Sequence, residues 1–282
     1  MGFLLLCNGG FMFFAVLMSW YYEDGVTLSI TIAGMLTIFA GVIVMFFTRN
    51  HKKELFKKEG YLVVTFGWII MSLSGTLPYV LSETIPSFTN SFFETISGYT
   101  TTGASILTEI ETLPKGILFW RSLTHWIGGM GIIVLAIAIL PLLGIGGMQL
   151  FAAESPGPSI GKLKPRITDT AKRLWYIYAG LTFIETVLLK IAGMGVFDAL
   201  NHAMSTIATG GFSTKNASAA YWNDEPMIQY ILIIFMFLSG ANFVMSYLGF
   251  KGQFRTVFQD EEFRWYAGFI AFFTIVTAGV IF

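Results

Sequence analysis

FFETISGYTTTGAS, residues 92–105, is a short semi-polar stretch between two long apolar runs. At its centre the chain reads Thr100, Thr101, Thr102 and Gly103. A cation that leaves water needs oxygen atoms in its place, and an extended backbone offers a carbonyl about every 3 Å when successive peptides face one axis. Glycine permits the positive φ that helps neighbouring carbonyls face one way, and threonine adds a hydroxyl acceptor. We therefore interpret this stretch as a passage that lines a cation pathway, whereas the simpler interpretation is a turn between helices.

A second stretch, FDALNHAMSTIATGGFS at residues 197–213, repeats the pattern. An offset of 107 residues places Gly210 on Gly103 and Thr209 on Thr102, while Ile207 and Ala208 face Thr100 and Thr101. If backbone carbonyls coordinate the ion, these side-chain differences are tolerable. Two turns at the same place in two similar sequence contexts favour a repeated pore element over two unrelated turns. The second passage is expected at Ile207, Ala208, Thr209 and Gly210.

Composition places the chain in the membrane. Of its 282 residues, 55% are hydrophobic and only 12% are charged, which excludes a disordered chain and disfavours a soluble domain. The formal net charge is zero, so nothing indicates a nucleic-acid partner. The single cysteine, Cys7, allows neither an internal disulfide nor a thiolate metal cluster. No phosphate-binding loop, dinucleotide fingerprint or catalytic triad stands out, so we expect a protein that is not an enzyme and holds no covalent cofactor.

The apolar runs predict an all-α polytopic membrane protein in which two leading helices precede tandem helix, half-helix, helix repeats. A bilayer core requires about 20 helical residues, and most of the runs reach that length. We expect crossings at about 1–20, 26–48, 60–81, 114–150, 174–192, 226–250 and 265–282. The corresponding segments are 1–59 (leading helices and a basic loop), 60–150 (first repeat), 151–250 (loop and second repeat) and 251–282 (loop and start of a third repeat).

Two runs are too short to cross. The run at 86–97 would rise only about 15 Å as a helix, half of the hydrocarbon thickness, and the run at 197–206 is similar. We expect each to be a re-entrant half-helix that enters from the outer face. Ser87 or Asn90 is expected to cap the first half-helix, Gly98 to end it, and Asp198 to cap the second.

The basic residues orient the chain. Of 17 Lys and Arg residues, the three predicted inner loops hold five (49–59), five (151–173) and three (251–264), whereas the outer segments hold Lys115 and Lys215. Cytoplasmic loops collect basic residues, so this asymmetry predicts a cytoplasmic N-terminus.

Several polar residues fall within the apolar runs. Glu94 and His202 lie at the same level of the two half-helices, where we expect them to form hydrogen bonds behind the passages; a metal site or proton relay is the alternative. Glu185 falls near the centre of a crossing, where a cavity-facing role and a buried hydrogen bond are both open. His125 is expected to be a packing or interface histidine. Asn242 is expected to bond across helices or to face the pore.

The strings SGYTTTGAS, HWIGGMGIIVLAIAILP, AESPGP and STIATGGFST closely resemble the TrkH branch of the Trk/Ktr/HKT potassium-transport superfamily. The resemblance covers essentially the whole chain. It implies a potassium-transport subunit of a bacterial inner membrane, channel-like, with potassium as its substrate and the two passages as filter strands. It also implies a homodimer on a cytoplasmic, nucleotide-binding regulatory partner of the TrkA type.

The family pattern has four repeats around one pore, whereas this chain supplies two and the beginning of a third. Two strands leave half of an ion's coordination shell absent, so we expect either a fragment of a longer product or two chains that pair to close a ring. A non-conducting assembly or regulatory subunit is the competing function. An intramembrane enzyme built on Glu94, Glu185 or the histidines lacks a nucleophile and metal-ligand spacing.

Overall fold

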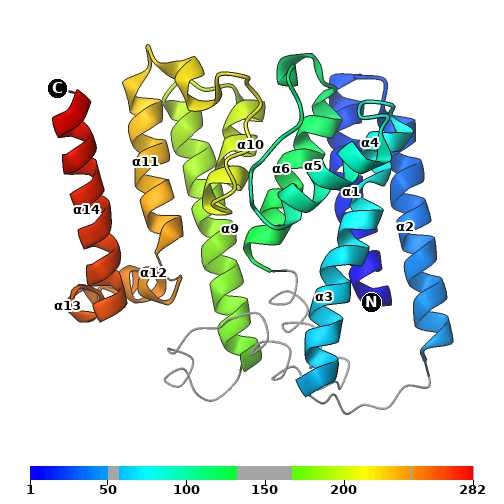
Figure 1. Ribbon diagram of the computed structural model, residues 1–282, viewed down its shortest axis with the longest axis horizontal. Helices are drawn as coiled ribbons and strands as arrows, with labels where there is room; N and C mark the ends of the chain where they lie inside the picture. The colour runs from blue at the N-terminus through cyan, green and yellow to red at the C-terminus, as the bar shows by residue number, and fades with distance from the viewer. Residues whose placement is uncertain (50–56, 132–166, 242, 282) are drawn as a thin grey trace.

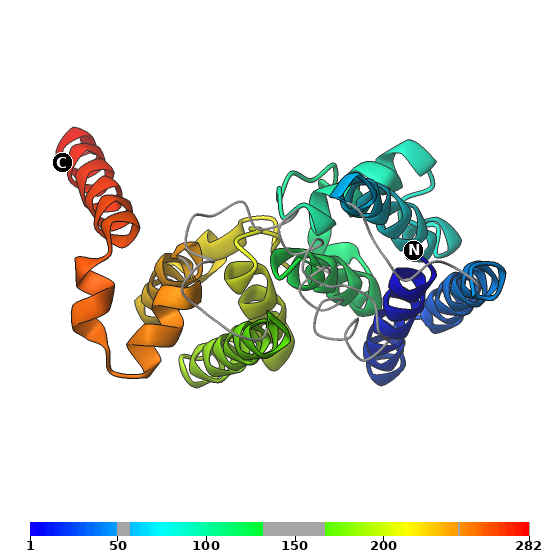
Figure 2. The ribbon, with the colours of Figure 1, turned by 90° about the horizontal axis from the view of Figure 1, so that it is seen from below.

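The computed structural model describes residues 1–49, 57–131, 167–241 and 243–281, and this part of the chain is helical with no β-strand. The helices stand side by side in a row that is one or two helices deep (Figures 1 and 2). Five of them are long and apolar enough to cross a membrane. The fold is therefore that of an all-α polytopic membrane protein, as predicted.

The two leading helices pack closely along their length. They are α1 (Gly2–Tyr22) and α2 (Thr27–Phe47), within two residues of the predicted crossings. A Cβ atom added at Gly9 would lie 2.8 Å from the carbonyl oxygen of Gly34, and one at Gly41 would lie 2.9 Å from that of Gly2. Small residues at such contacts let two helix backbones approach, which is how membrane helices commonly associate.

The third predicted crossing, 60–81, is broken in two. It comprises α3 (Lys57–Gly75) and α4 (Leu77–Leu81), with a turn at Thr76 between them. Pro78 has no backbone N–H to donate to the preceding turn, which accounts for the interruption. The segment Leu62–Leu81 still has the length and hydropathy of one membrane span.

Two 12-residue helices, α5 (Phe88–Tyr99) and α10 (Val196–Ile207), are the predicted half-helices. At 1.5 Å per residue each rises about 18 Å, too little to cross a bilayer. The Ser87 side chain caps α5 by accepting from the backbone N–H of Asn90. Gly98 does not end α5 as expected: the helix continues to Tyr99, with Thr100 as its C-cap. Gly98 has another role, because a Cβ at this residue would collide with the Thr124 hydroxyl.

Helix α6 (Lys115–Gly129) lies between the two half-helices, with α9 (Ile167–Ile191) on the far side of α10 (Figure 1). Within the described part of the predicted crossing 114–150, α6 ends at Gly129; residues 132–150, which include Pro141, lie outside the described residues. Helix α9 begins seven residues earlier than the predicted crossing 174–192, so part of the expected loop is helix.

The predicted crossing 226–250 is likewise two helices, α11 (Pro226–Gly240) and α12 (Phe243–Phe250). The hydroxyl of Tyr266 donates to the carbonyl of Phe237, which satisfies a carbonyl that the broken helix leaves free. Asn242 lies outside the described residues.

The last part of the chain differs from the expected loop at 251–264. Most of it is helix, as α13 (Phe254–Gln259) and the start of α14 (Glu261–Ile281). Helix α14 contacts the end of α11 through Tyr266, near the end where α12 and α13 join it to the rest, and its remainder stands apart from α11 (Figures 1 and 2). Its apolar side chains are largely exposed, as suits a surface that faces lipid or further helices.

Candidate functional site

Each half-helix ends in a tight backbone turn of the same design. After α5, the amide of Thr102 donates to the carbonyl of Ser97 at 2.9 Å, and after α10 the amide of Gly210 donates to that of Ser205 at 2.9 Å. The φ angle is +52° at Thr101 and +55° at Thr209, and it is +74° and +89° at the glycines two residues later. A β-branched residue rarely adopts positive φ, and here it does so at the same place in both repeats.

This geometry corrects the predicted register by one residue. Thr101 matches Thr209 and Gly103 matches Gly211, an offset of 108 that also relates both ends of α5 and α10. Ile207 is therefore the last residue of its half-helix, and the second passage runs from Ala208 to Gly211. The alignment of Gly210 with Gly103 was wrong because two glycines are adjacent in the second passage. Gly210 takes the place of Thr102, and Gly211 is the glycine with positive φ.

Gly210 is required for a different reason. A Cβ at this residue would lie 2.1 Å from Nδ1 of His125, so the ring of that histidine occupies the space. The His125 Nδ1 atom also lies 2.9 Å from the Ser205 hydroxyl of α10. His125 is thus a packing residue, as expected, and it packs directly on the second passage.

The two passages contact each other and rest on one helix. A Cβ at Gly103 would lie 1.9 Å from the carbonyl oxygen of Gly210, so these residues already touch. On α6, Gly128 lies against the carbonyl of Tyr99, and Gly129 against the backbone of Ala208. The close approach of the backbone at these two glycines brings both passages to the same helix.

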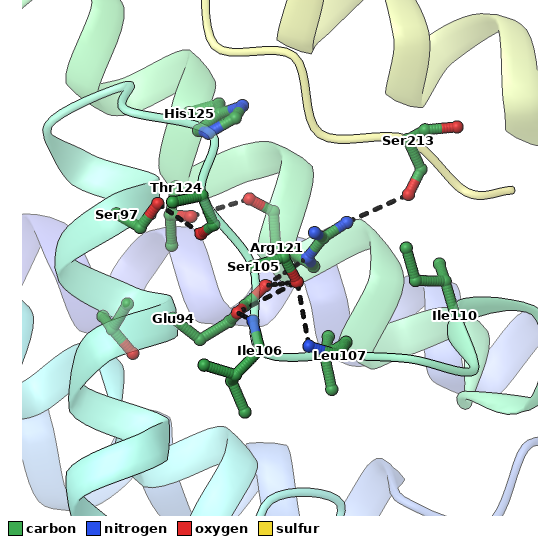
Figure 3. A network of polar contacts seen from close by, with 12 residues as sticks. Glu94, Ser97, Ser105, Ile106, Leu107, Ile110, Arg121, Thr124, His125 and Ser213 are labelled. Atoms are coloured by element: carbon green, nitrogen blue, oxygen red, sulfur yellow. Dashed lines mark hydrogen bonds and ion pairs between the residues drawn. The ribbon is translucent and has the colours of Figure 1, made fainter. Parts of the chain in front are cut away.

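Glu94 lies behind the first passage and is fully buried. Its carboxylate accepts hydrogen bonds from the Ser105 hydroxyl at 2.9 and 3.1 Å and from the backbone N–H of Ile106 at 3.1 Å. The Nε atom of Arg121 on α6 donates to the same carboxylate at 2.6 Å (Figure 3). Glu94 therefore ties the chain beyond the passage to the half-helix before it.

His202 lies behind the second passage at the position of Glu94, because the offset between them is also 108. Its Nε2 atom is 3.1 Å from the Ser213 hydroxyl, and Ser213 matches Ser105. Both passages are thus followed by a serine that bonds to the half-helix. Asp198 is not the expected N-cap of α10: Gly195 holds that place, and Asp198 accepts from the Thr214 hydroxyl.

Arg121 is the site residue that the sequence did not identify. Its Nη1 atom donates to the carbonyl of Ser213 at 2.9 Å, and its guanidinium carbon lies 3.6 Å from the ring centroid of Phe212. The Phe212 ring stacks on His125 at 3.8 Å. An arginine within an apolar run was the available signal, but its partners lie 27 and 92 residues away in the chain.

Two expectations for polar residues can be compared with the structure. Glu185 is fully buried in α9, and neither carboxylate oxygen has a hydrogen-bond partner among the described residues; the Thr206 hydroxyl lies beside it. The described residues contain no group of three or more His, Cys, Asp or Glu side chains placed to hold a metal ion. Glu94 and His202 each bind within their own repeat.

The fold and the site together define a class: a multi-pass helical membrane protein with two re-entrant half-helices whose C-terminal turns meet on one helix. The family model described as "TrkH: Cation transport protein" matches residues 27–275. The chain belongs to the TrkH family.

Relatives agree with this assignment. The chain is 44% identical over 270 residues to the Trk system potassium uptake protein TrkH of Salmonella typhimurium, covering 95% of this chain and 56% of that protein. It is 41% identical over 281 residues to TrkH of Halomonas elongata, covering 99% of this chain and 58% of that protein. The crystal structure of the potassium transporter TrkH from Vibrio parahaemolyticus superposes with a TM-score of 0.76 at 38% identity, covering 95% of this chain and 54% of that one. The chain thus spans a little over half the length of these relatives.

Proposed function

We propose that this chain forms part of a potassium-conducting pore and that Thr100–Gly103 and Ala208–Gly211 are two of its filter strands. The observation that carries the proposal is the pairing of positive φ at Thr101 and Gly103 with positive φ at Thr209 and Gly211. Strained backbone of this kind persists where the surrounding structure enforces it, and it gathers at functional sites.

The chemistry suits a weakly hydrated monovalent cation. Positive φ at alternate residues lets neighbouring carbonyls face one side, and a row of carbonyl oxygens can replace the hydration shell of potassium. No carboxylate belongs to either passage: Glu94 is committed to Ser105, Ile106 and Arg121. Neutral oxygens bind weakly enough for an ion to leave again, which conduction requires.

The relatives are named potassium uptake proteins, and this chain spans about half of their length. We infer that further repeats, from the same reading frame or a second copy, complete the ring of filter strands. We further propose a bacterial inner-membrane location with a cytoplasmic N-terminus, a homodimeric assembly and a nucleotide-binding regulatory partner. The basic residues between α2 and α3 and at the start of α9 support that orientation.

The test is potassium uptake by a bacterial strain that lacks its own uptake systems and expresses the complete reading frame containing this chain. Growth at low potassium and rubidium influx above those of an empty vector are expected. A membrane-inserted, stable protein with no influx, which restores influx to a separately expressed relative, would instead support an assembly or regulatory role. Sodium influx equal to rubidium influx would contradict the potassium filter.

A further inference from the structure

We propose that Arg121 is a positioning residue that sets the spacing of the two passages and thereby acts on ion selectivity. This inference rests on the proposed function, because it concerns the geometry of the same passages. Among the described residues, the Arg121 side chain donates to Glu94 and Ser213 rather than to Thr100–Gly103 or Ala208–Gly211, so it acts through those two residues.

The guanidinium uses two of its nitrogens on two different repeats. Nε donates to Glu94 on the half-helix of the first repeat, at 2.6 Å. Nη1 donates to the carbonyl of Ser213, two residues beyond the second passage, at 2.9 Å. Glu94 in turn holds Ser105, two residues beyond the first passage. One rigid, planar group therefore joins the matching points that follow both passages (Figure 3).

The position of the guanidinium is itself fixed. Its side chain is only 2% exposed, and its carbon lies 3.6 Å from the ring centroid of Phe212, one residue beyond the second passage. The other side of that ring stacks on His125, which lies against Gly210. A sideways movement of Arg121 would therefore push on the second passage through Phe212 as well as pull on Ser213.

The second repeat lacks this ion pair in the described part of the chain. His202 takes the place of Glu94, and its hydrogen bond, to Ser213, stays within its own repeat. Another of the hydrogen bonds between the repeats lies further along the chain, where Asn216 accepts from the backbone N–H of Ile110 at 2.8 Å. That bond joins the loops beyond the passages, and it supplies a control for a general loss of contact between the repeats.

The decisive variant is Arg121→Lys in the complete reading frame. Lysine keeps the charge beside Glu94, but a single ammonium cannot replace two separate guanidinium donors. We expect the potassium-to-sodium permeability ratio to fall about tenfold, the scale of one lost charge-assisted hydrogen bond. Asn216→Ala, which removes a different hydrogen bond between the repeats, is expected to keep the wild-type ratio.

A second measurement does not depend on conduction. Spin labels at the exposed residues Thr108 and Ala220, in a background without other cysteines that includes Cys7→Ser, report the distance between the loops that follow the passages. Arg121→Lys should broaden this distance distribution. The distribution in Asn216→Ala should be narrower than the distribution in Arg121→Lys. A structural role without influence on the passages would leave both the distribution and the permeability ratio unchanged.

The outcomes separate this inference from the proposed function. If the wild type carries no potassium, the proposed function fails, and the distance distribution alone decides the role of Arg121. If the wild type conducts and Arg121→Lys keeps both the ratio and the distribution, the inference is overturned, as it is if Asn216→Ala has an equal effect. If Arg121→Lys fails to fold, the charge-neutral pair Arg121→Met with Glu94→Gln takes its place; a wild-type distribution there overturns the inference and a broadened one supports it.

Discussion

The Nε atom of Arg121 lies 2.6 Å from Oε1 of Glu94, and the two side chains are 2% and 0% exposed. Removing two charges from water is expensive, and their attraction offsets this only when the remaining lone pairs and protons find partners. Here the carboxylate also accepts from Ser105 and Ile106, and the guanidinium also donates to Ser213. The pair therefore belongs to a network that gives a partner to both carboxylate oxygens and to the Nε and Nη1 atoms of the guanidinium.

Loss of Arg121 alone should lower the stability of the protein more than loss of both charges. Arg121→Met leaves the Glu94 carboxylate buried without a cation, and we expect it to lower the free energy of unfolding by about 3–5 kcal/mol. Arg121→Met combined with Glu94→Gln should recover a large part of that loss, because no unpaired charge remains. Unfolding titrations in mixed detergent micelles, followed by circular dichroism, measure both. Equal stability of the single and double variants would show that the charges are not coupled.

The sequence was sufficient to predict most of the membrane-length helices, the half-helices and the existence of both passages, because apolar length and a repeated threonine–glycine turn are local signals. It did not give the register of the second passage. Gly210 and Gly211 are both glycines, but one avoids the ring of His125 and the other adopts positive φ. Only the three-dimensional neighbours distinguish these two reasons for a glycine.

The network behind the passages was predicted in part. Glu94 and His202 were identified from their level in the two half-helices, but Arg121 was not assigned to them. Its partners come from α5 and from the chain after the second passage, and pairing them requires the packing of α6 between α5 and α10. The break between α11 and α12 was missed for a similar reason, since Tyr266, which bonds to α11, lies 29 residues from its acceptor.

Alanine substitutions should separate the two requirements for glycine. At Gly103 the backbone φ is +74°, and a Cβ would also collide with the Gly210 carbonyl. At Gly211 the φ is +89°, but a Cβ would meet no atom within 4 Å. Left-handed backbone costs an L-residue about 1–2 kcal/mol. We therefore expect Gly211→Ala to reduce potassium selectivity moderately and Gly103→Ala to abolish it. The ratio of rubidium to sodium influx, normalised to the protein inserted in the membrane, is the measurement.

Gly180→Ala is the matched control for these variants, since this glycine lies within α9 and a Cβ there would meet no atom within 4 Å. Alanine is favoured over glycine within helices by about 1 kcal/mol, so stability should hold or rise with influx unchanged. If Gly103→Ala behaved like this control, the assignment of the first passage as a filter strand would be wrong.

The buried tyrosines make a second matched pair. The Tyr99 hydroxyl donates to the buried Oδ1 atom of Asn8 at 2.6 Å, while the equally buried Tyr79 hydroxyl has no partner among the described residues. Tyr99→Phe should lower the free energy of unfolding by about 1–3 kcal/mol, because Asn8 then keeps an unsatisfied acceptor. Tyr79→Phe should leave it unchanged or raise it. The same detergent titration tests both, and a greater loss at Tyr79 would contradict these hydrogen-bond assignments.

Glu185 and Glu94 form the last pair, since both are fully buried and, among the described residues, only Glu94 has hydrogen-bond partners. Glu94→Gln places an amide where Arg121, Ser105 and Ile106 require an acceptor, and we expect a loss of about 3–5 kcal/mol in the free energy of unfolding. Glu185→Gln removes an ionisable group from a depth at which its charge would cost about 2.5–3.5 kcal/mol, so stability and potassium influx should hold or rise. A loss at Glu185 as large as that at Glu94 would mean that a partner beyond the described residues binds this carboxyl, and influx in the two variants would then show whether that partner belongs to the pathway.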